Sequence, residues 1–412
     1  MRLLAVAGPM LVLALALGVT AQRQSWRPTL GQTLAVGAGL RVTVALLAHA
    51  NHWQPFDFAY DFPHAGENVL QHRDPLLNVR PYGWNYLPTM AYVFAAQLKI
   101  AAVTGLPWTI AGRLVPVAAD LMVTVLVGNI SGGQKRLRRF QYATNPVAIL
   151  VASVHGQMEP LCLAFGVAAF VAARAGRGYR AGLLAAVAVS AKSWPVLLLP
   201  GLMLALPDLK GRIRALLTLS GVLAALFLSM PLLVGTAASR LPDAAQQLLS
   251  YRSASGEWGW TAIGVWIRAA GLGSQPPTSW AGIGALLTVL ALATTMYIWR
   301  RADPVDLTAA VLTVFLVVTA GFGSQYLLWP VPFLIARPTR MTSIATMAAS
   351  VWATFGYLQL TLSDGTYQRE HQLWVNCSVL VILALLSALP WSRRNQSRLA
   401  RQLDQAVSYA AT

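Results

Sequence analysis

Residues 279–301 read SWAGIGALLTVLALATTMYIWRR, and this stretch indicates the class of fold. Residues 279–298 contain no charged side chain, and two arginines follow after a single tryptophan. A helix needs about 20 largely apolar residues to cross the hydrocarbon core of a bilayer. Tryptophan and arginine are typical of the edges of such a helix. The stretch therefore predicts a membrane-spanning helix.

Similar apolar runs fill most of the remaining chain. They lie near 3–21, 30–49, 87–106, 109–130, 144–173, 181–206, 214–236, 306–322, 325–337, 341–360 and 373–390. The run 144–173 is long enough for two helices, whereas 325–337 is short for one. The sequence thus predicts an all-α polytopic membrane helix bundle with roughly 10–13 spans, forming a single domain over 1–412.

The composition agrees with a membrane protein. Of the 412 residues, 56% are hydrophobic and 11% charged, whereas soluble proteins carry about 25% charged residues. This excludes an ordinary soluble enzyme, a disordered chain and a nucleic-acid-binding domain. We attribute the net charge of +17 to basic loops that contact lipid headgroups, so membrane lipids are the expected anionic partners. Cys162 and Cys377 lie in apolar runs and lack the spacing of a zinc site.

Clusters of basic residues, such as Lys135 to Arg139 and Arg174 to Arg180, separate many of the apolar runs and indicate part of the membrane topology. The positive-inside rule places them in the cytoplasm, together with a basic tail over 391–412. The same rule, applied to the cluster Lys135 to Arg139, would also put the loop 51–86 in the cytoplasm if both 87–106 and 109–130 span. We expect an uncleaved helix rather than a signal peptide at 3–21, because no small-residue cleavage motif follows it.

Three polar connections are too long for simple turns: 51–86, 237–262 and 361–372. Connections of this length often bind or catalyse. The loop 51–86 holds four of the chain's 14 acidic residues, among many aromatic rings and histidines. Rings that stack on sugar faces, beside a carboxylate that takes a hydroxyl proton, are typical of a sugar site. Amphipathic helices on a membrane surface would use the same rings.

Charged residues inside apolar runs need partners, because an isolated charge in the membrane costs several kcal/mol. Asp120 follows Arg113 by seven residues on the same helical face, so an ion pair with Arg113 or with a neighbouring helix is expected. Glu159 follows a predicted helix break at His155–Gln157. Lys192 either contacts a phosphate or extends its stem to the interface.

The ordered motifs of the chain resemble a family, the GT-C membrane glycosyltransferases, and within it the polyprenyl-phosphate-mannose-dependent mannosyltransferases. The resemblance covers about 51–336. Its elements are Asp57-Phe58-Ala59-Tyr60, Val69 to Pro75, Trp84-Asn85-Tyr86-Leu87-Pro88, Arg113, Ala119-Asp120-Leu121, Asn145-Pro146, Gly156-Gln157, Lys192, Pro195, Tyr251 to Gly259, and Ser324 to Pro330. His72 and Leu76 stand where that family often has Gly and Tyr.

The resemblance implies a GT-C-like bundle with extracytoplasmic loop helices, 51–86 being the catalytic loop and 237–262 a second extracytoplasmic loop. This sidedness conflicts with the charge rule for 51–86, and we follow the resemblance. It implies an inverting transfer of a sugar, mannose in the first instance, from a polyprenyl-phosphate donor to a lipid or cell-envelope glycan acceptor. The expected location is the bacterial plasma membrane.

The expected site follows from the same chemistry. Asp57 or Asp61 acts as the base. Donor phosphate is expected at Lys192, Arg252 and Arg240, and substrate contacts are expected at Tyr60, His155, Gln157, Glu159, Gln325 and His371. Asp57 and Asp61 share a helical face at spacing i, i+4, as a two-carboxylate metal site would require, but no third metal ligand is evident. The resemblance implies an enzyme that acts without metal, so neither metal nor cofactor is expected.

The competing interpretation is a transporter or lipid flippase with a path along Asp120, Glu159 and Lys192. Inverted-repeat transporters show internal repeats, and none is visible in this sequence. The long acidic and aromatic loop 51–86 also favours the enzyme.

Overall fold

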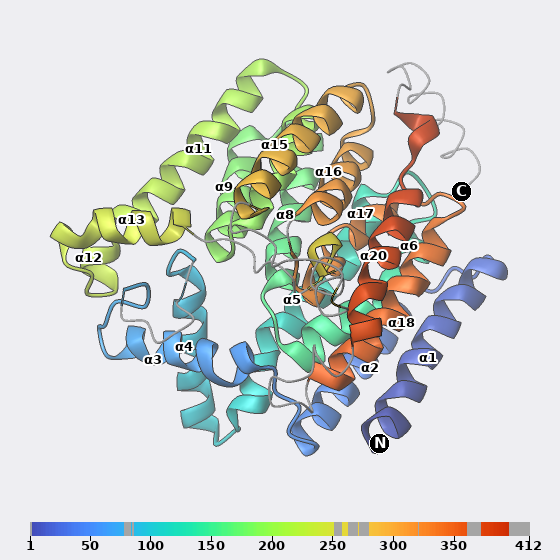
Figure 1. Cartoon of the computed structure of the whole chain (residues 1–412), viewed down its shortest axis with the longest axis horizontal. Helices are drawn as coiled ribbons and strands as arrows, with labels where there is room; N and C mark the ends of the chain where they lie inside the picture. Colours follow the sequence, from blue (N-terminus) through green and yellow to red (C-terminus); the bar gives the residue numbers. More distant parts are fainter. Residues whose placement is uncertain are drawn as a thin grey trace. The chain divides into compact units, whose positions relative to one another are not determined.

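Helices make up all the regular structure that the computed structural model describes, and no strand occurs in that part of the chain (Figure 1). The structure describes residues 2–77, 84, 86–250, 258–262, 271, 280–319, 321–360 and 372–394. Arg252, His371 and most of the basic tail over 391–412 lie outside these residues. The predicted all-α class is confirmed.

The helices follow the apolar runs of the sequence, with short helices in the polar loops. The α-helices are α1 (Arg2–Arg23), α2 (Leu30–Ala50), α3 (Phe62–Leu70), α4 (Thr89–Thr104), α5 (Trp108–Ile130), α6 (Lys135–Ala143), α7 (Pro146–Ile149), α8 (Glu159–Arg174), α9 (Gly178–Ala191), α10 (Leu199–Ala205), α11 (Leu209–Leu228), α12 (Met230–Leu233), α13 (Leu241–Ser250), α15 (Trp280–Ile298), α16 (Pro304–Val318), α17 (Val331–Ala336), α18 (Thr342–Leu360) and α20 (Gln372–Ser387). The short elements are two π-helical turns, η1 (Asp57–Asp61) and η2 (Leu150–His155), and four 3₁₀ turns, η3 (Trp194–Leu198), η4 (Ala238–Arg240), η5 (Ser324–Leu328) and η6 (Trp391–Arg393).

Four helical stretches in the described residues are long and apolar enough to cross a membrane: Leu30–Ala50, Trp108–Ile130, Leu209–Leu228 and Leu373–Arg393. Further apolar helices of 10–17 residues accompany them. Membrane association of the chain is therefore supported, while the number of 10–13 spans stays a prediction.

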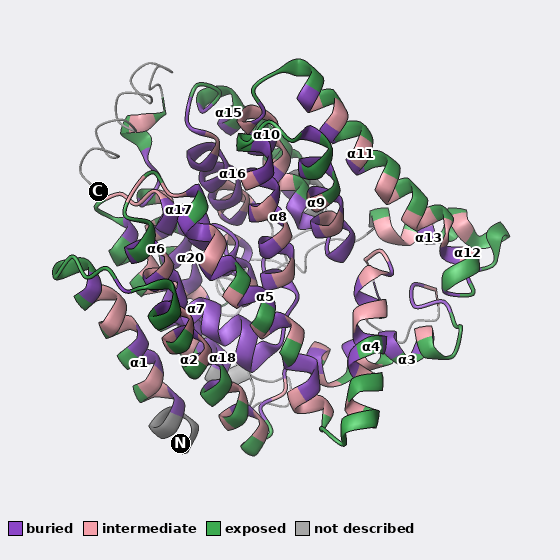
Figure 2. Cartoon of the chain, turned by 180° about the vertical axis from the view of Figure 1, so that it is seen from behind, coloured by how far each residue is buried: buried purple, intermediate pink, exposed green. Residues whose placement is uncertain are grey.

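The chain divides into two compact units. Unit 1 consists of Met1–Leu40, Thr124–Leu150 and Ser253–Thr412, and unit 2 of Arg41–Val123 and Val151–Arg252. In unit 2, α11 is exposed along much of its length, whereas most of α8 is buried (Figure 2). The exposed side chains of α11 include Leu209, Leu216 and Leu217, which suits a helix surrounded by lipid tails.

Small residues let α9 and α11 of unit 2 pack closely. A Cβ atom on Gly178 would collide with the backbone of Gly211, and one on Gly182 would collide with the backbone of Ala215. Glycines four residues apart on one helix face permit this approach in membrane helices, where dispersion contacts drive helix association.

A buried ion pair joins α2 and α5 within unit 2. Nε of Arg41 donates to Oδ2 of Asp120 over 2.6 Å, and both side chains are fully buried. Of the two partners expected for Asp120, the neighbouring helix is the one found. Arg113 has other partners, described below.

In unit 1, two tryptophans fix α18 against α20. The rings of Trp352 and Trp374 stack with their centroids 4.5 Å apart. Each indole N–H donates to the other residue's carbonyl, over 2.9 and 3.0 Å. The pair satisfies both buried indole donors without water.

Candidate functional site

The site is built around Asp57, the first residue of η1 in unit 2. The only π-helical turns in the described residues are η1, which carries Asp57, and η2, which ends at His155. Single π-helical turns are rare and occur frequently at functional sites, because they rotate side chains out of the regular helical register.

Three donors hold the carboxylate of Asp57. Nε2 of His155 lies 2.9 Å from Oδ1 and 3.0 Å from Oδ2, and Nε2 of Gln157 donates to Oδ2 over 2.6 Å. The N–H of Phe58 donates to Oδ1 over 2.9 Å. An ionised carboxylate only accepts, so Nε2 of His155 carries the hydrogen. The Asp57 side chain remains 30% exposed, so a substrate hydroxyl can reach it.

The backbone between His155 and Gln157 depends on glycine. Gly156 adopts φ +69°, and a Cβ atom there would lie 2.5 Å from Cε2 of Phe58. Only glycine meets both demands without strain. The amide of Gln157 is oriented because its Oε1 accepts from the N–H of Met158 over 3.0 Å, which turns Nε2 toward Asp57.

Arg113 of α5 connects the segments on either side of the site. Its guanidinium donates to the carbonyls of Val154 (2.7 Å) and Trp53 (2.6 Å), and also to that of Thr109. It lies over the ring of Phe58, 4.3 Å from the centroid. Arg113 is 1% exposed, so it positions Phe58 and His155 rather than contacting a substrate.

The aromatic rings of the loop divide into two groups. Phe58 stacks on Trp108, whose Nε1 donates to the carbonyl of Phe58 over 2.8 Å. Phe62 stacks on Phe94 with centroids 4.7 Å apart. These rings form a local core that anchors η1 and α3 to α4 and α5.

The second group faces outward. Tyr60 is 63% exposed and Phe56 is 56% exposed, and their ring centroids lie 5.0 Å apart. Among the predicted substrate contacts, Tyr60 is thus an accessible ring on the same turn as Asp57.

The two carboxyls of η1 differ in their pKa values. Partial burial raises the pKa of Asp57, but the neighbouring His155, Lys192 and Phe58 N–H outweigh it and bring the pKa below the ordinary value. Partial burial and the charge of Asp57 raise the pKa of Asp61 to about 6, partly offset by His64. Asp57 is therefore ionised at neutral pH. The hydrogen bonds from His155 and Gln157 that fix its orientation make it the stronger candidate for the base.

A second ion pair lies beside this group. Nζ of Lys192 donates to Oε1 of Glu159 over 2.6 Å, with exposures of 4% and 0%. Lys192 follows α9 in extended backbone, and its Nζ lies 5.4 Å from the centroid of the Tyr86 ring. It is close enough to Asp57 to lower the pKa of that carboxyl. An ammonium has three donors, so the bond to Glu159 does not exclude a further anionic contact.

Two further predicted residues, Arg240 and Gln325, belong to other elements of the described structure. Arg240 is 53% exposed and pairs with Asp243 over 3.3 Å. Gln325 belongs to η5 in unit 1. Within 237–262, helix α13 occupies Leu241–Ser250.

Sequence reasoning assigned no positioning role to two residues of the site. Trp108 and Arg113 hold the backbone of the site through side-chain donors. The available signal was their position at the start of an apolar run, since a tryptophan donor and an arginine there both need acceptors. Asp74, another acidic residue of the loop 51–86, stabilises the turn that follows it, because its Oδ1 accepts hydrogen bonds from the N–H groups of Leu76 and Leu77.

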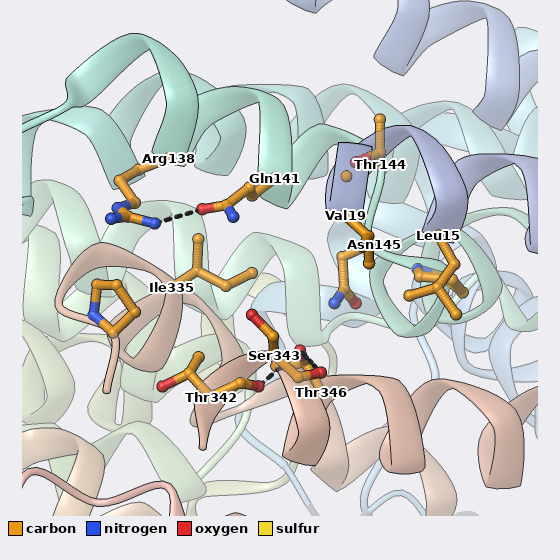
Figure 3. A pocket seen from close by; sticks show the side chains of 13 residues that line it. Leu15, Val19, Arg138, Gln141, Thr144, Asn145, Ile335, Thr342, Ser343 and Thr346 are labelled. Atoms are coloured by element: carbon orange, nitrogen blue, oxygen red, sulfur yellow. Dashed lines mark hydrogen bonds between the residues drawn. The ribbon is translucent and has the colours of Figure 1, made fainter. Parts of the chain in front are cut away.

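No group of three or more His, Cys, Asp and Glu side chains suited to a metal ion occurs among the described residues. Unit 1 has a pocket of mixed character, lined by Arg138, Gln141, Ile335 and Thr346 among others (Figure 3). Its volume of about 60 Å³ suits a few water molecules and not a sugar.

Comparison with known proteins adds no assignment. Neither the known protein families nor the curated proteins give a match to this chain.

Proposed function

We propose that this protein is a membrane glycosyltransferase of the GT-C type that transfers a sugar, mannose in the first instance, with inversion. The donor is a polyprenyl-phosphate sugar, and the acceptor is a lipid or cell-envelope glycan on the extracytoplasmic side of a bacterial plasma membrane. The observation that carries the proposal is the Asp57 carboxylate, which is partly exposed, held by His155 and Gln157, and near Lys192.

In the proposed reaction, Asp57 accepts the proton of the acceptor hydroxyl as that oxygen attacks the anomeric carbon. The bond from the anomeric carbon to the phosphate oxygen breaks, and the electron pair leaves with the polyprenyl phosphate. The low pKa of Asp57 keeps the carboxylate ionised before the reaction. His155 and Gln157 fix its orientation, which aligns a base with the attacking oxygen.

Lys192 is the proposed partner of the departing phosphate. A cation near the leaving group stabilises the charge that develops on it in the transition state. The ion pair with Glu159 holds the ammonium at a fixed place beside Asp57, so little reorganisation is needed when the phosphate arrives. The pair Phe56 and Tyr60 offers exposed rings for a sugar face.

The transporter alternative has less support. Its three charged residues are divided between two separate ion pairs, Asp120 with Arg41 and Glu159 with Lys192. Paired buried charges are also what a static helix bundle requires.

The test uses purified protein reconstituted in lipid, with labelled polyprenyl-phosphate-mannose and an extract of acceptor lipids. The expected result is label in an acceptor product of opposite anomeric configuration. Arabinose- and glucose-linked donors in parallel identify the sugar. No transfer from any of these donors would contradict the proposal.

A further inference from the structure

Five arginines of unit 1 follow the C-terminal ends of α15, α17 and α20. They are Arg300, Arg301, Arg337, Arg393 and Arg394. Two of them are neutralised. Arg337 donates to both carboxylate oxygens of Asp306 over 3.0 and 3.1 Å, and Arg393 donates to Oδ1 of Asp306 over 3.2 Å. Asp303 adds a second acid, 3.7 Å from Arg337. This network joins the start of α16 to the chain after α17 and α20.

The other three arginines surround a hollow of about 460 Å³. Arg300, Arg301 and Arg394, together with Ile298, line it. All three arginines are exposed, and no acidic side chain in the described part of the chain pairs with them. Arg300 donates to the carbonyl of Tyr297 over 2.6 Å. Three positive charges thus face one open space.

The surroundings of the hollow match a membrane surface. The neighbouring turns of α15 expose Leu286, Val289 and Leu290. Tyr297 is 66% exposed and Trp391 is 40% exposed. Exposed aliphatic side chains that give way to aromatic rings and then to arginines are the order found along a helix that leaves the hydrocarbon core.

We propose that this hollow binds the phosphate headgroup of an anionic phospholipid. Arginine forks bind phosphate oxygens in pairs, and basic pockets between membrane helices accept such headgroups. The exposed face of α15 would carry the acyl chains, which distinguishes a lipid from a free phosphate ion. The hollow belongs to unit 1, and the proposal does not depend on the proposed reaction.

The test measures which lipids stay bound. Full-length protein is incubated with mixed phosphatidylglycerol and phosphatidylcholine, re-isolated in detergent, and its lipids are quantified by mass spectrometry. The variant R300Q/R301Q/R394Q is compared with R174Q/R177Q/R180Q, which removes the same charge from three exposed arginines of unit 2. Thermal melts check that both variants fold like the wild type.

The expected result is enrichment of phosphatidylglycerol on the wild type and the control. Each arginine should contribute roughly fivefold to that enrichment, so the first triple variant should lose roughly 100-fold. Equal losses in both triple variants, or none in the first, would overturn the proposal. Stabilisation of the wild type by inorganic phosphate in pure phosphatidylcholine, to the level given by phosphatidylglycerol, would overturn the lipid assignment.

Discussion

Nε2 of His155 lies 2.9 Å from Oδ1 of Asp57, although 98 positions separate the two residues in the chain. The contact joins the two π-helical turns η1 and η2. It makes His155 part of the electrostatic environment that sets the pKa of Asp57. The role of Asp57 as a base can therefore be tested through its neighbour.

Replacing His155 by Gln should raise the pKa of Asp57, because the histidine's positive charge and hydrogen bond lower it. The acid limb of the pH–rate profile, where transfer slows because Asp57 becomes protonated, should then move to higher pH. The pH–rate profile measures this shift. His64→Gln changes an exposed histidine on the neighbouring helix α3 and should leave the limb nearly in place. An unchanged limb in His155→Gln would mean that Asp57 does not limit the rate.

Gly156→Ala should destabilise the protein and slow transfer. The left-handed backbone costs a non-glycine residue about 1–2 kcal/mol, and the collision with Phe58 should add about 1–3 kcal/mol. Gly105→Ala is the matched control, because Gly105 has φ +71° and nothing within 4 Å of an added Cβ. Thermal melts of the two variants isolate the collision. Equal melting temperatures would show that the Phe58 contact is unimportant.

Arg113→Lys should destabilise the protein and lower the transfer rate, although the net charge stays the same. A lysine cannot donate to the carbonyls of Trp53 and Val154 in the same geometry, and each carbonyl left without a donor costs about 1–3 kcal/mol. Because His155 is then less well positioned, transfer should fall by roughly 10–100-fold. Arg136→Lys, at an exposed position of α6, serves as the control. Full activity of Arg113→Lys would remove Arg113 from the positioning role.

Asp61→Asn should stabilise the folded protein at pH 8. The pKa of Asp61 is raised from 3.8 to about 6 in the folded state, so its ionised form destabilises the fold. That destabilisation is complete above about pH 6 and disappears as the pH falls toward 4. Melts of wild type and variant at pH 8, 6 and 4 should therefore converge with acid. A constant difference across this range would argue against the raised pKa.

The sequence predicts the helical class, and it names three polar residues that lie together in the structure. Long uncharged runs predict helices because a bilayer offers backbone groups no other partner. Asp57 was predicted from the acidic and aromatic loop 51–86, and His155 and Gln157 from the helix break and the resemblance. The structure brings these three side chains together.

The partners of buried charges could not be predicted in the same way. The spacing of Arg113 and Asp120 allowed an ion pair, but Arg41 of α2 pairs with Asp120 and backbone carbonyls receive Arg113. The way in which two helices are aligned against each other decides which charged residues pair. The hydrophobic periodicity of each helix in the sequence does not reveal that alignment. The rings of Phe58 and Phe62 looked available for sugar, yet they pack on Trp108 and Phe94.

The most direct measurement is the initial rate of sugar transfer by Asp57→Asn, with labelled polyprenyl-phosphate-mannose or whichever donor the wild type uses. Asparagine keeps the size of the side chain and removes its ability to accept a proton, so the rate should fall by about 100-fold or more. Asp243→Asn, the same change at an exposed position, should transfer at the wild-type rate. Transfer by Asp57→Asn at the wild-type rate would contradict the assignment of Asp57 as the catalytic base.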